Sequence, residues 1–152
     1  MDLITISRYF DDLKVGDRFE SDRFLVTEEA IVEFANQFDP QGFHLDPTAA
    51  GGTIFGGLTA SGWHTAAITM RLFVQTLNFA KGVIGLGVDE LRWPAPVRPG
   101  DVLRVETEIL KLRRSKSKPQ FGIVKFRYTT RNQSNKIVQR MFASGLVRVR
   151  DN

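Results

Sequence analysis

The sequence contains no cysteine among its 152 residues. Disulfide bonds, thiolate nucleophiles and zinc sites built on cysteine are therefore excluded, and the composition gives no sign of secretion. Histidine is almost as scarce, with two residues in the chain. We expect no metal site, because the two histidines and the nearby acids have no recognisable ligand spacing.

Long hydrophobic runs are also missing. The first residues, MDLITISRYFDD, lack a basic region followed by an apolar run, so we expect no signal peptide. The longest weakly charged stretch, 56–80, has one formal charge but also four threonines, a serine, a histidine, a glutamine and an asparagine. Such a stretch is too polar to face lipid, so we expect a cytoplasmic protein with no membrane partner.

The overall composition is that of a folded domain. Hydrophobic residues make up 42% of the chain and charged residues 25%, which is ordinary for a globular protein, and the length suits a single domain over 1–152. The net charge of +4 suits an anionic partner. We expect a phosphorylated small molecule rather than nucleic acid, because the strands lack a paired aromatic motif for base stacking.

The N-terminal half predicts one strand followed by a helix. Residues 13–27 indicate a turn that leads into a single strand, and 28–37 has apolar residues at helical spacing. Thr27 can cap this helix at its start. Pro40 and Gly42 end it, because proline and glycine interrupt helices.

The middle of the chain predicts a second short helix and then a long one. Asp46 and Pro47 form a helix start signal, with an aspartate as cap and proline in the first position. The segment from about 58 to 79 is apolar nearly all round, which is typical of a buried helix. Gly56 and Gly57 lie just before it, and we expect them to open this helix.

The C-terminal half changes to a period of two. Apolar residues alternate with charged ones over 103–109 and 124–130, and 141–149 fits a further strand. Four long antiparallel strands therefore follow the long helix. The order predicts an α+β fold in which a long central helix is wrapped by a curved antiparallel sheet.

The stretch FDPQGFHLDP, residues 38–47, is the main candidate for chemistry. Asp39 and His44 are five residues apart, so they cannot lie along one helical face. Pro40 and Gly42 allow an irregular loop to fold back and bring the two side chains together. A carboxylate and an imidazole that converge can act as an acid and base pair near neutral pH. The alternative is that both residues only satisfy hydrogen bonds of the loop.

These residues resemble the motif of the MaoC-like, or R-specific enoyl-CoA hydratase, family. Asp39 and His44 fall on the Asp and His of that motif, and the resemblance extends over about residues 13–150. The segment IFGGLTASGWHTAAITMRL is similar to the family's central helix, and LRWPAPVRPGDVLRV to the strand and turn after it. The resemblance implies a hot-dog fold.

The sequence departs from the family pattern at several positions near the motif. Gln41 replaces an asparagine, Gly42 replaces a proline, and Phe55 stands where a histidine often precedes the glycine. His64 lies near a position where a small hydroxyl residue is expected. The departures leave the Asp39 and His44 pair intact, and they lie where the family pattern would otherwise indicate the acyl part of the substrate.

The resemblance implies hydration of a trans-2-enoyl-CoA to a 3-hydroxyacyl-CoA, or the reverse dehydration. Asp39 and His44 would activate water, and backbone amides at Gly56 and Gly57 would stabilise the thioester oxygen. No cofactor is expected, since coenzyme A is part of the substrate. A homodimer, or a multiple of dimers, is expected. Three further residues are expected to line or support the site: Gln41, Ser61 and His64.

Two other functions remain open. A hot-dog thioesterase usually takes an acid from the central helix, and 56–80 contains no Asp or Glu. A non-catalytic acyl-CoA-binding module would not need the acid and base pair. The basic run RRSKSKP is either a solvated hairpin tip or a contact to the phosphates of coenzyme A. Its charged residues are Arg113, Arg114, Lys116 and Lys118.

Overall fold

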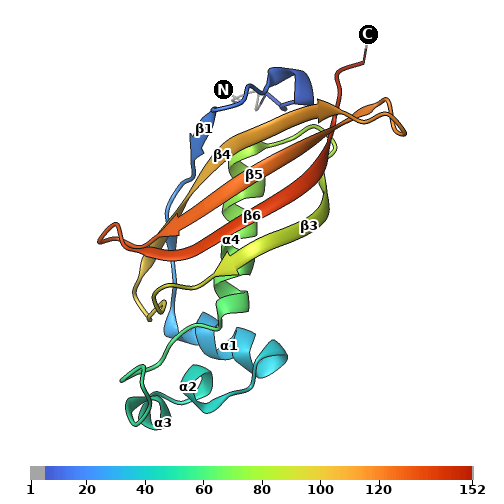
Figure 1. Cartoon of the computed structure of the whole chain (residues 1–152). Helices are drawn as coiled ribbons and strands as arrows, with labels where there is room; N and C mark the ends of the chain where they lie inside the picture. The colour runs from blue at the N-terminus through green and yellow to red at the C-terminus, as the bar shows by residue number, and fades with distance from the viewer. Residues whose placement is uncertain (1–5, 152) are drawn as a thin grey trace, which may run out of the picture.

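The computed structural model describes residues 6–151. Its centre is one helix, α4 (Gly62–Leu77), which lies against one face of an antiparallel sheet (Figure 1). The strand order is β1-β4-β5-β6-β3, and β2 pairs with β4 off this path. The strands are β1 (Arg18–Glu20), β2 (Phe24–Leu25), β3 (Val83–Arg92), β4 (Val102–Arg114), β5 (Phe121–Arg131) and β6 (Ile137–Arg148).

The alternating pattern of the C-terminal half is confirmed. Along residues 102–109 of β4 and throughout β5, successive side chains are alternately buried and half-exposed, so the buried set forms one apolar face. On that face the Phe73 ring of α4 meets Phe126 and Tyr128, with ring centroids 5.0 and 4.8 Å apart. Aromatic pairs contribute about 0.5–1.5 kcal/mol each beyond the area that they bury, so this cluster fixes the helix on the sheet.

Two predictions about elements are wrong. The N-terminal strand is not continuous but divided into β1 and β2, both paired with β4. The central helix begins at Gly62 rather than near 58, and it is not buried all round. Trp63, Met70 and Val74 form an exposed stripe with exposed fractions of 60%, 44% and 47%. The helix therefore has two apolar faces, and residues 6–151 cover one of them.

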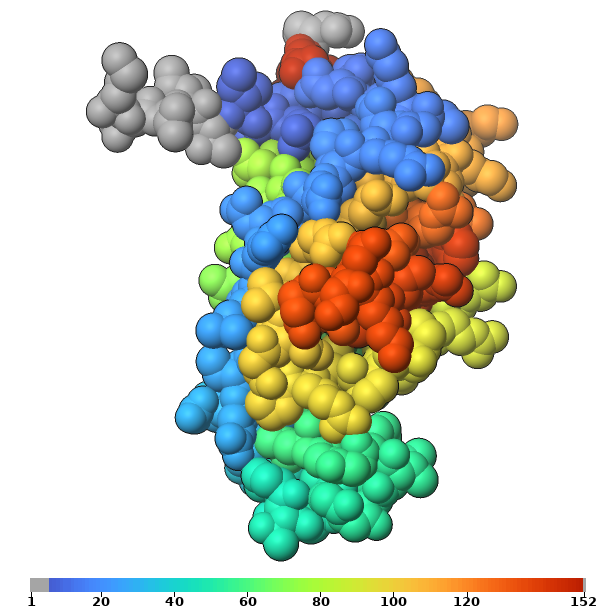
Figure 2. All heavy atoms as spheres, turned by 90° about the vertical axis from the view of Figure 1, so that its left-hand side faces the viewer, coloured from blue at the N-terminus to red at the C-terminus, as the bar shows by residue number. Residues whose placement is uncertain are grey.

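The three helices between β2 and α4 form a cap at one end of the sheet (Figure 1), and Figure 2 shows the cyan to green residues of this end at the bottom of the molecule. Thr27 accepts a hydrogen bond from the Ala30 N–H, and Asp46 accepts one from the Thr48 N–H, so both predicted helix caps are confirmed. The cap helices are α1 (Glu28–Phe38), α2 (Gly42–Leu45) and α3 (Pro47–Gly51), and a 3-10 turn, η1 (Phe10–Asp12), lies near the opposite end.

The loop predicted between Pro40 and Asp46 is not wholly irregular. Residues 42–45 form the short helix α2, with Gln41 as its N-cap and Asp46 at its end. Glycine at 42 is tolerated there because the helix is a single turn, and its closing hydrogen bond runs from the Asp46 N–H to the Gly42 carbonyl. Within residues 6–151, no helix combines the length and apolar character needed to cross a bilayer.

Candidate active site

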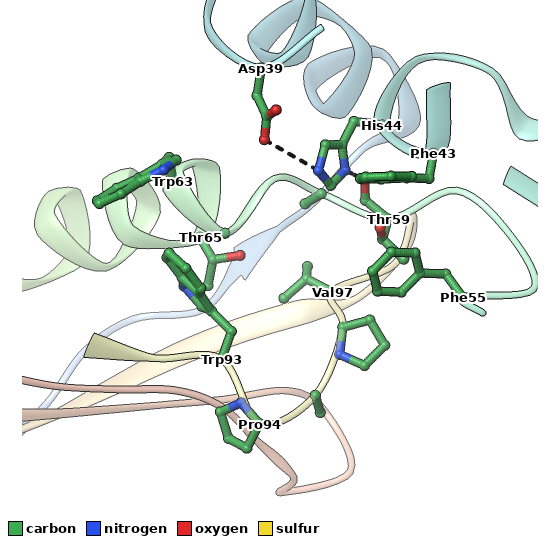
Figure 3. A pocket seen from close by; sticks show the side chains of 14 residues that line it. Asp39, Phe43, His44, Phe55, Thr59, Trp63, Thr65, Trp93, Pro94 and Val97 are labelled. Atoms are coloured by element: carbon green, nitrogen blue, oxygen red, sulfur yellow. Dashed lines mark hydrogen bonds and ion pairs between the residues drawn. The ribbon is translucent and has the colours of Figure 1, made fainter. Parts of the chain in front are cut away.

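The structure brings Asp39 and His44 together. Asp39 is the residue that ends α1, and His44 lies in α2, so the turn between the two helices reverses the chain. His44 Nε2 lies 3.3 Å from Asp39 Oδ2 (Figure 3). The imidazole is buried and the carboxylate is 18% exposed, which places the pair at the edge of solvent.

The Asp39 carboxylate is held in its ionised form. Burial raises its pKa, but hydrogen bonds donated by Ser61 Oγ at 2.7 Å and Gln41 Nε2 at 2.6 Å lower it, as does the positive charge of His44 when its imidazole is protonated. The net result is a pKa below the ordinary value of 3.8. Asp39 therefore carries a full negative charge at neutral pH.

The tautomer of His44 follows from its other contact. His44 Nδ1 lies 2.6 Å from the carbonyl oxygen of Thr59. A carbonyl can only accept a hydrogen bond, so Nδ1 must carry the proton. In the neutral imidazole, Nε2 then presents a lone pair toward Asp39 and the open site.

Thr59 and Ala60, in the segment before α4, hold the site in position through backbone hydrogen bonds. The Thr59 N–H donates to the Phe43 carbonyl at 3.0 Å, while the Thr59 carbonyl accepts from His44. The next residue, Ala60, donates its N–H to the Val97 carbonyl at 2.8 Å. This segment is thus tied to α2 on one side and to the connection between β3 and β4 on the other.

A cavity of about 450 Å³ opens beside the pair. Its wall is mostly aromatic and apolar, and Figure 3 shows Asp39 and His44 on one side with Trp93 and Pro94 facing them. Such a cavity, with few polar groups, suits a small organic ligand. The lining residues include Phe43, Phe55, Thr59, Ala60, Gly62, Trp63, Thr65, Trp93, Pro94, Ala95, Pro96 and Val97.

The prediction that Gly56 and Gly57 open the central helix is wrong. Ser61 is the N-cap of α4 and Gly62 its first residue, while Gly56 has a positive φ of 65° in the preceding loop. The Gly56 N–H already donates to the Thr53 carbonyl at 3.0 Å. Neither Gly56 nor Gly57 lines the cavity, whereas Gly62 does.

The three supporting residues have different positions. Ser61 and Gln41 both bind the Asp39 carboxylate, so Gln41 contacts the acid rather than the imidazole. His64 is buried against Phe34, with ring centroids 4.7 Å apart, and does not line the cavity. Among residues 6–151 its Nδ1 has no hydrogen-bond partner, and burial lowers its pKa below 6.5.

The basic run does not approach the cavity within one chain. It forms the hairpin between β4 and β5, at the end of the sheet opposite the cap (Figure 1). Arg114 is paired there with Asp11 at 3.3 Å. For Arg113, Lys116 and Lys118, the described part of the chain provides no ion-pair partner.

The described residues also contain no group of three or more histidine, aspartate or glutamate side chains arranged to hold a metal ion.

The sequence did not reveal several residues that shape the site. Trp93, Thr59 and Gly62 enter the cavity wall from segments that carry no motif for chemistry. One signal was present: Ser61 before an apolar run is a typical N-cap, and it would have placed the helix start at Gly62.

Together, a helix wrapped by an antiparallel sheet and a paired carboxylate and imidazole beside a cavity define a candidate acid–base site on a hot-dog fold. The model of the MaoC like domain matches residues 13–132. The chain belongs to this family.

Known relatives agree with this assignment. The chain is 52% identical to a MaoC-like dehydratase from Rhodospirillum rubrum, with a TM-score of 0.91 over 96% of this chain and 100% of that one. It is 27% identical to R-hydratase PhaJ1 from Pseudomonas aeruginosa, with a TM-score of 0.78 over 93% and 86% of the chains. Protein YdeM of Bacillus subtilis, which is uncharacterised, is 30% identical over 81% of this chain and 86% of its own. The predicted hot-dog fold is confirmed.

Proposed function

We propose that this protein adds water to a trans-2-enoyl-CoA to give a 3-hydroxyacyl-CoA, or catalyses the reverse dehydration. The observation that carries the proposal is the geometry of the pair, with His44 Nε2 3.3 Å from Asp39 Oδ2 at the edge of the cavity. Family membership supports the same chemistry, since the relatives named above include a MaoC-like dehydratase and an R-hydratase.

The hydrogen bonds around the pair suit activation of water. Both His44 Nε2 and Asp39 Oδ2 face the site as acceptors, so a water molecule between them can donate a hydrogen bond to each. As the water oxygen bonds to C3, Nε2 takes a proton, and the ionised Asp39 stabilises the imidazolium that forms. The imidazolium then returns a proton to C2. This step needs no metal or organic cofactor beyond the coenzyme A of the substrate.

A further group must stabilise the charge that develops on the thioester oxygen. We assign this role to the N–H of Gly62 in place of Gly56 and Gly57. Gly62 lines the cavity as the first residue of α4, and its N–H makes no hydrogen bond within residues 6–151. The N-terminus of a helix also carries a partial positive charge that favours an oxyanion.

The test is a hydration assay that follows loss of the conjugated thioester, with thiol release measured in parallel. We expect hydration by the wild type, and a loss of about 10²–10⁴-fold in kcat for Asp39→Asn and for His44→Gln. Asp46→Asn is a matched control, because Asp46 caps α3 outside the cavity and asparagine is an equally good cap. Correctly folded Asp39 and His44 variants that retain full turnover would disprove the assignment.

The parallel thiol readout tests the thioesterase alternative. α4 contributes no carboxylate to the cavity, which speaks against hydrolysis. Thiol release without hydration would replace the proposal with a thioesterase. Binding of acyl-CoA with neither reaction would replace it with a binding module.

We also propose that the protein acts as a homodimer or a multiple of dimers. β3 is an edge strand with exposed apolar side chains at Ile84, Leu86 and Val88, each about half exposed. The exposed stripe of α4 adds Trp63 and Met70. An unpaired apolar edge normally needs a cover, and a second copy supplies one. We expect light scattering to show a dimer or a larger assembly, and we expect Leu86→Lys to weaken the association between the copies. A monomer that retains activity would contradict the proposal.

The basic hairpin can contact coenzyme A only across such a dimer, because within one chain it lies at the opposite end of the sheet. If it does, replacing Arg113 and Lys116 with glutamine raises KM for enoyl-CoA at low salt, but not for a pantetheine thioester. Equal KM values would leave the run as a solvated hairpin tip.

A further inference from the structure

Trp93 occupies a restricted position in the cavity wall. It follows β3 directly, and its indole ring lies against the first turn of α4. A Cβ atom on Gly62 would lie 2.5 Å from Cε2 of that ring. The ring therefore packs on bare helix backbone and cannot move closer to α4.

The outer edge of the indole is held by a buried side chain. Trp93 Nε1–H donates to Gln139 Oε1 at 2.9 Å. Gln139 lies in β6 and is fully buried. Its amide nitrogen donates in turn to Thr69 Oγ1 on α4 at 3.0 Å.

Thr69 completes the network. Its hydroxyl donates to the Thr65 carbonyl at 2.9 Å and lies 2.7 Å from Thr130 Oγ1 in β5. Since the Thr69 proton is already used, Thr130 must be the donor in that contact. Thr69 thus makes one donated and two accepted hydrogen bonds, and both threonines are fully buried. The network joins Trp93, which directly follows β3, to β6, β5 and α4 behind the cavity.

Beyond Trp93, these hydrogen-bonded side chains lie between α4 and the sheet. An alkyl chain that continued there would have to separate hydrogen-bonded groups in a dry interior, and unpaired buried groups are costly. Behind the network stands the aromatic cluster of Phe73, Phe126 and Tyr128. We infer that Trp93, positioned by Gln139, closes the acyl end of the cavity and restricts the substrate to short acyl chains. The inference rests on the proposed function.

Trp63 offers a matched control. It also lines the cavity, and its ring meets that of Trp93 edge-on with centroids 5.4 Å apart. It is 60% exposed and, within the described residues, its side chain makes no hydrogen bond. Removal of this indole changes the same cavity without opening the network.

The kinetic test compares trans-2-butenoyl-CoA with trans-2-decenoyl-CoA. We expect the wild type to have a kcat/KM at least about tenfold lower for the longer substrate, since one methylene in a closed pocket already discriminates by about 10–200-fold. We expect Trp93→Ala to raise the ratio of kcat/KM for decenoyl-CoA to kcat/KM for butenoyl-CoA at least about tenfold. Trp63→Ala also removes an indole from the cavity wall, so it lowers kcat/KM for both substrates alike and leaves their ratio at the wild-type value. Equal kcat/KM values in the wild type, or an unchanged ratio in Trp93→Ala, would overturn the inference.

Gln139 acts through Trp93 and is tested as a positioning residue. Gln139→Leu frees the indole, so we expect the chain-length ratio to rise less than in Trp93→Ala, with a higher KM for butenoyl-CoA and little change in kcat. A merely structural role would lower activity on both substrates alike. Trp93→Leu replaces Trp93→Ala if circular dichroism shows that the alanine variant is unfolded.

Binding of the saturated analogues separates this inference from the proposed function. Calorimetry with butanoyl-CoA and decanoyl-CoA needs no turnover. We expect the wild type to bind butanoyl-CoA at least about tenfold more tightly, and Trp93→Ala to narrow the difference. If the wild type binds both equally, the inference fails even if hydration is observed. If hydration is absent but the binding difference is found, the proposed function fails and the closed acyl end stands.

Discussion

The sheet and the cap are built by different interactions. In the sheet, β4, β5 and β6 are joined by long backbone ladders, each with a single register shift, and the side chains of β5 alternate between the core and the outer face. In the cap, residues 38–61 are held largely by single hydrogen bonds, such as those from Ser61 to Asp39 and from His44 to Thr59. The difference suggests that the core supplies stability while the cap supplies chemistry. Mutations in the core should therefore lower stability, whereas mutations in the cap should lower activity.

The largest effects are expected from one substitution in each region. Phe73→Ala removes a buried ring from the aromatic cluster and should lower the free energy of unfolding by about 3–5 kcal/mol. His44→Gln should cost about 1 kcal/mol of stability, but lower hydration by about 10²–10⁴-fold. Urea unfolding and hydration rates measured on both variants check this. If His44→Gln unfolds as readily as Phe73→Ala, the two regions are not separable.

Gly62 lies where the two regions meet. In Gly62→Ala the new Cβ would approach the Trp93 ring to 2.5 Å, so we expect a loss of about 1–3 kcal/mol from overpacking and a lower kcat/KM. Gly51→Ala is the control, because a Cβ at that position in α3 meets no atom within 4 Å. Thermal unfolding and kinetics should distinguish the two alanines. Equal stability and equal kcat/KM in the two variants would show that the Trp93 ring moves aside without cost.

Ser61→Ala tests how the cap tunes its acid. The hydroxyl of Ser61 donates to the ionised Asp39 and helps to keep the pKa of that carboxyl below 3.8. Loss of this donor raises the pKa of Asp39, so the acid limb of the profile of kcat/KM against pH should move to higher pH. Ser61→Thr keeps a hydroxyl and should keep the wild-type limb. An unmoved limb in Ser61→Ala would mean that another group controls it.

The smallest effect concerns His64, which joins the cap to α4. Burial lowers its pKa below the ordinary 6.5, so the folded protein binds this proton less readily than the unfolded chain. The contribution of neutral His64 to the stability of the folded protein is therefore complete above pH 6.5. It is lost as the pH falls through the lower pKa that His64 has in the folded protein. His64→Phe keeps the contact with the Phe34 ring and should reduce the loss of stability between pH 7.5 and pH 5.0. Urea unfolding at both pH values measures this loss of stability. An identical loss in the wild type and in His64→Phe would contradict the prediction.

Local patterns in the sequence determined much of the fold. The alternation in β4 and β5, the helix caps at Thr27 and Asp46, and the breaks at Pro40 and Gly42 all act over a few residues, so they can be recognised without knowledge of the tertiary structure. The motif around Asp39 and His44 was found in the same way, through its resemblance to a known family.

Only the tertiary structure decided how the site is completed. Thr59, Trp93 and Gln139 are 15, 49 and 95 positions beyond His44 in the chain, and no local pattern links them to it. They converge because α4 packs on the sheet and buries polar groups that must then find partners. The sequence by itself determined which residues could act as acid and base. Packing over long sequence distances decided which form of His44 faces the cavity, where the helix N–H lies and where the cavity ends.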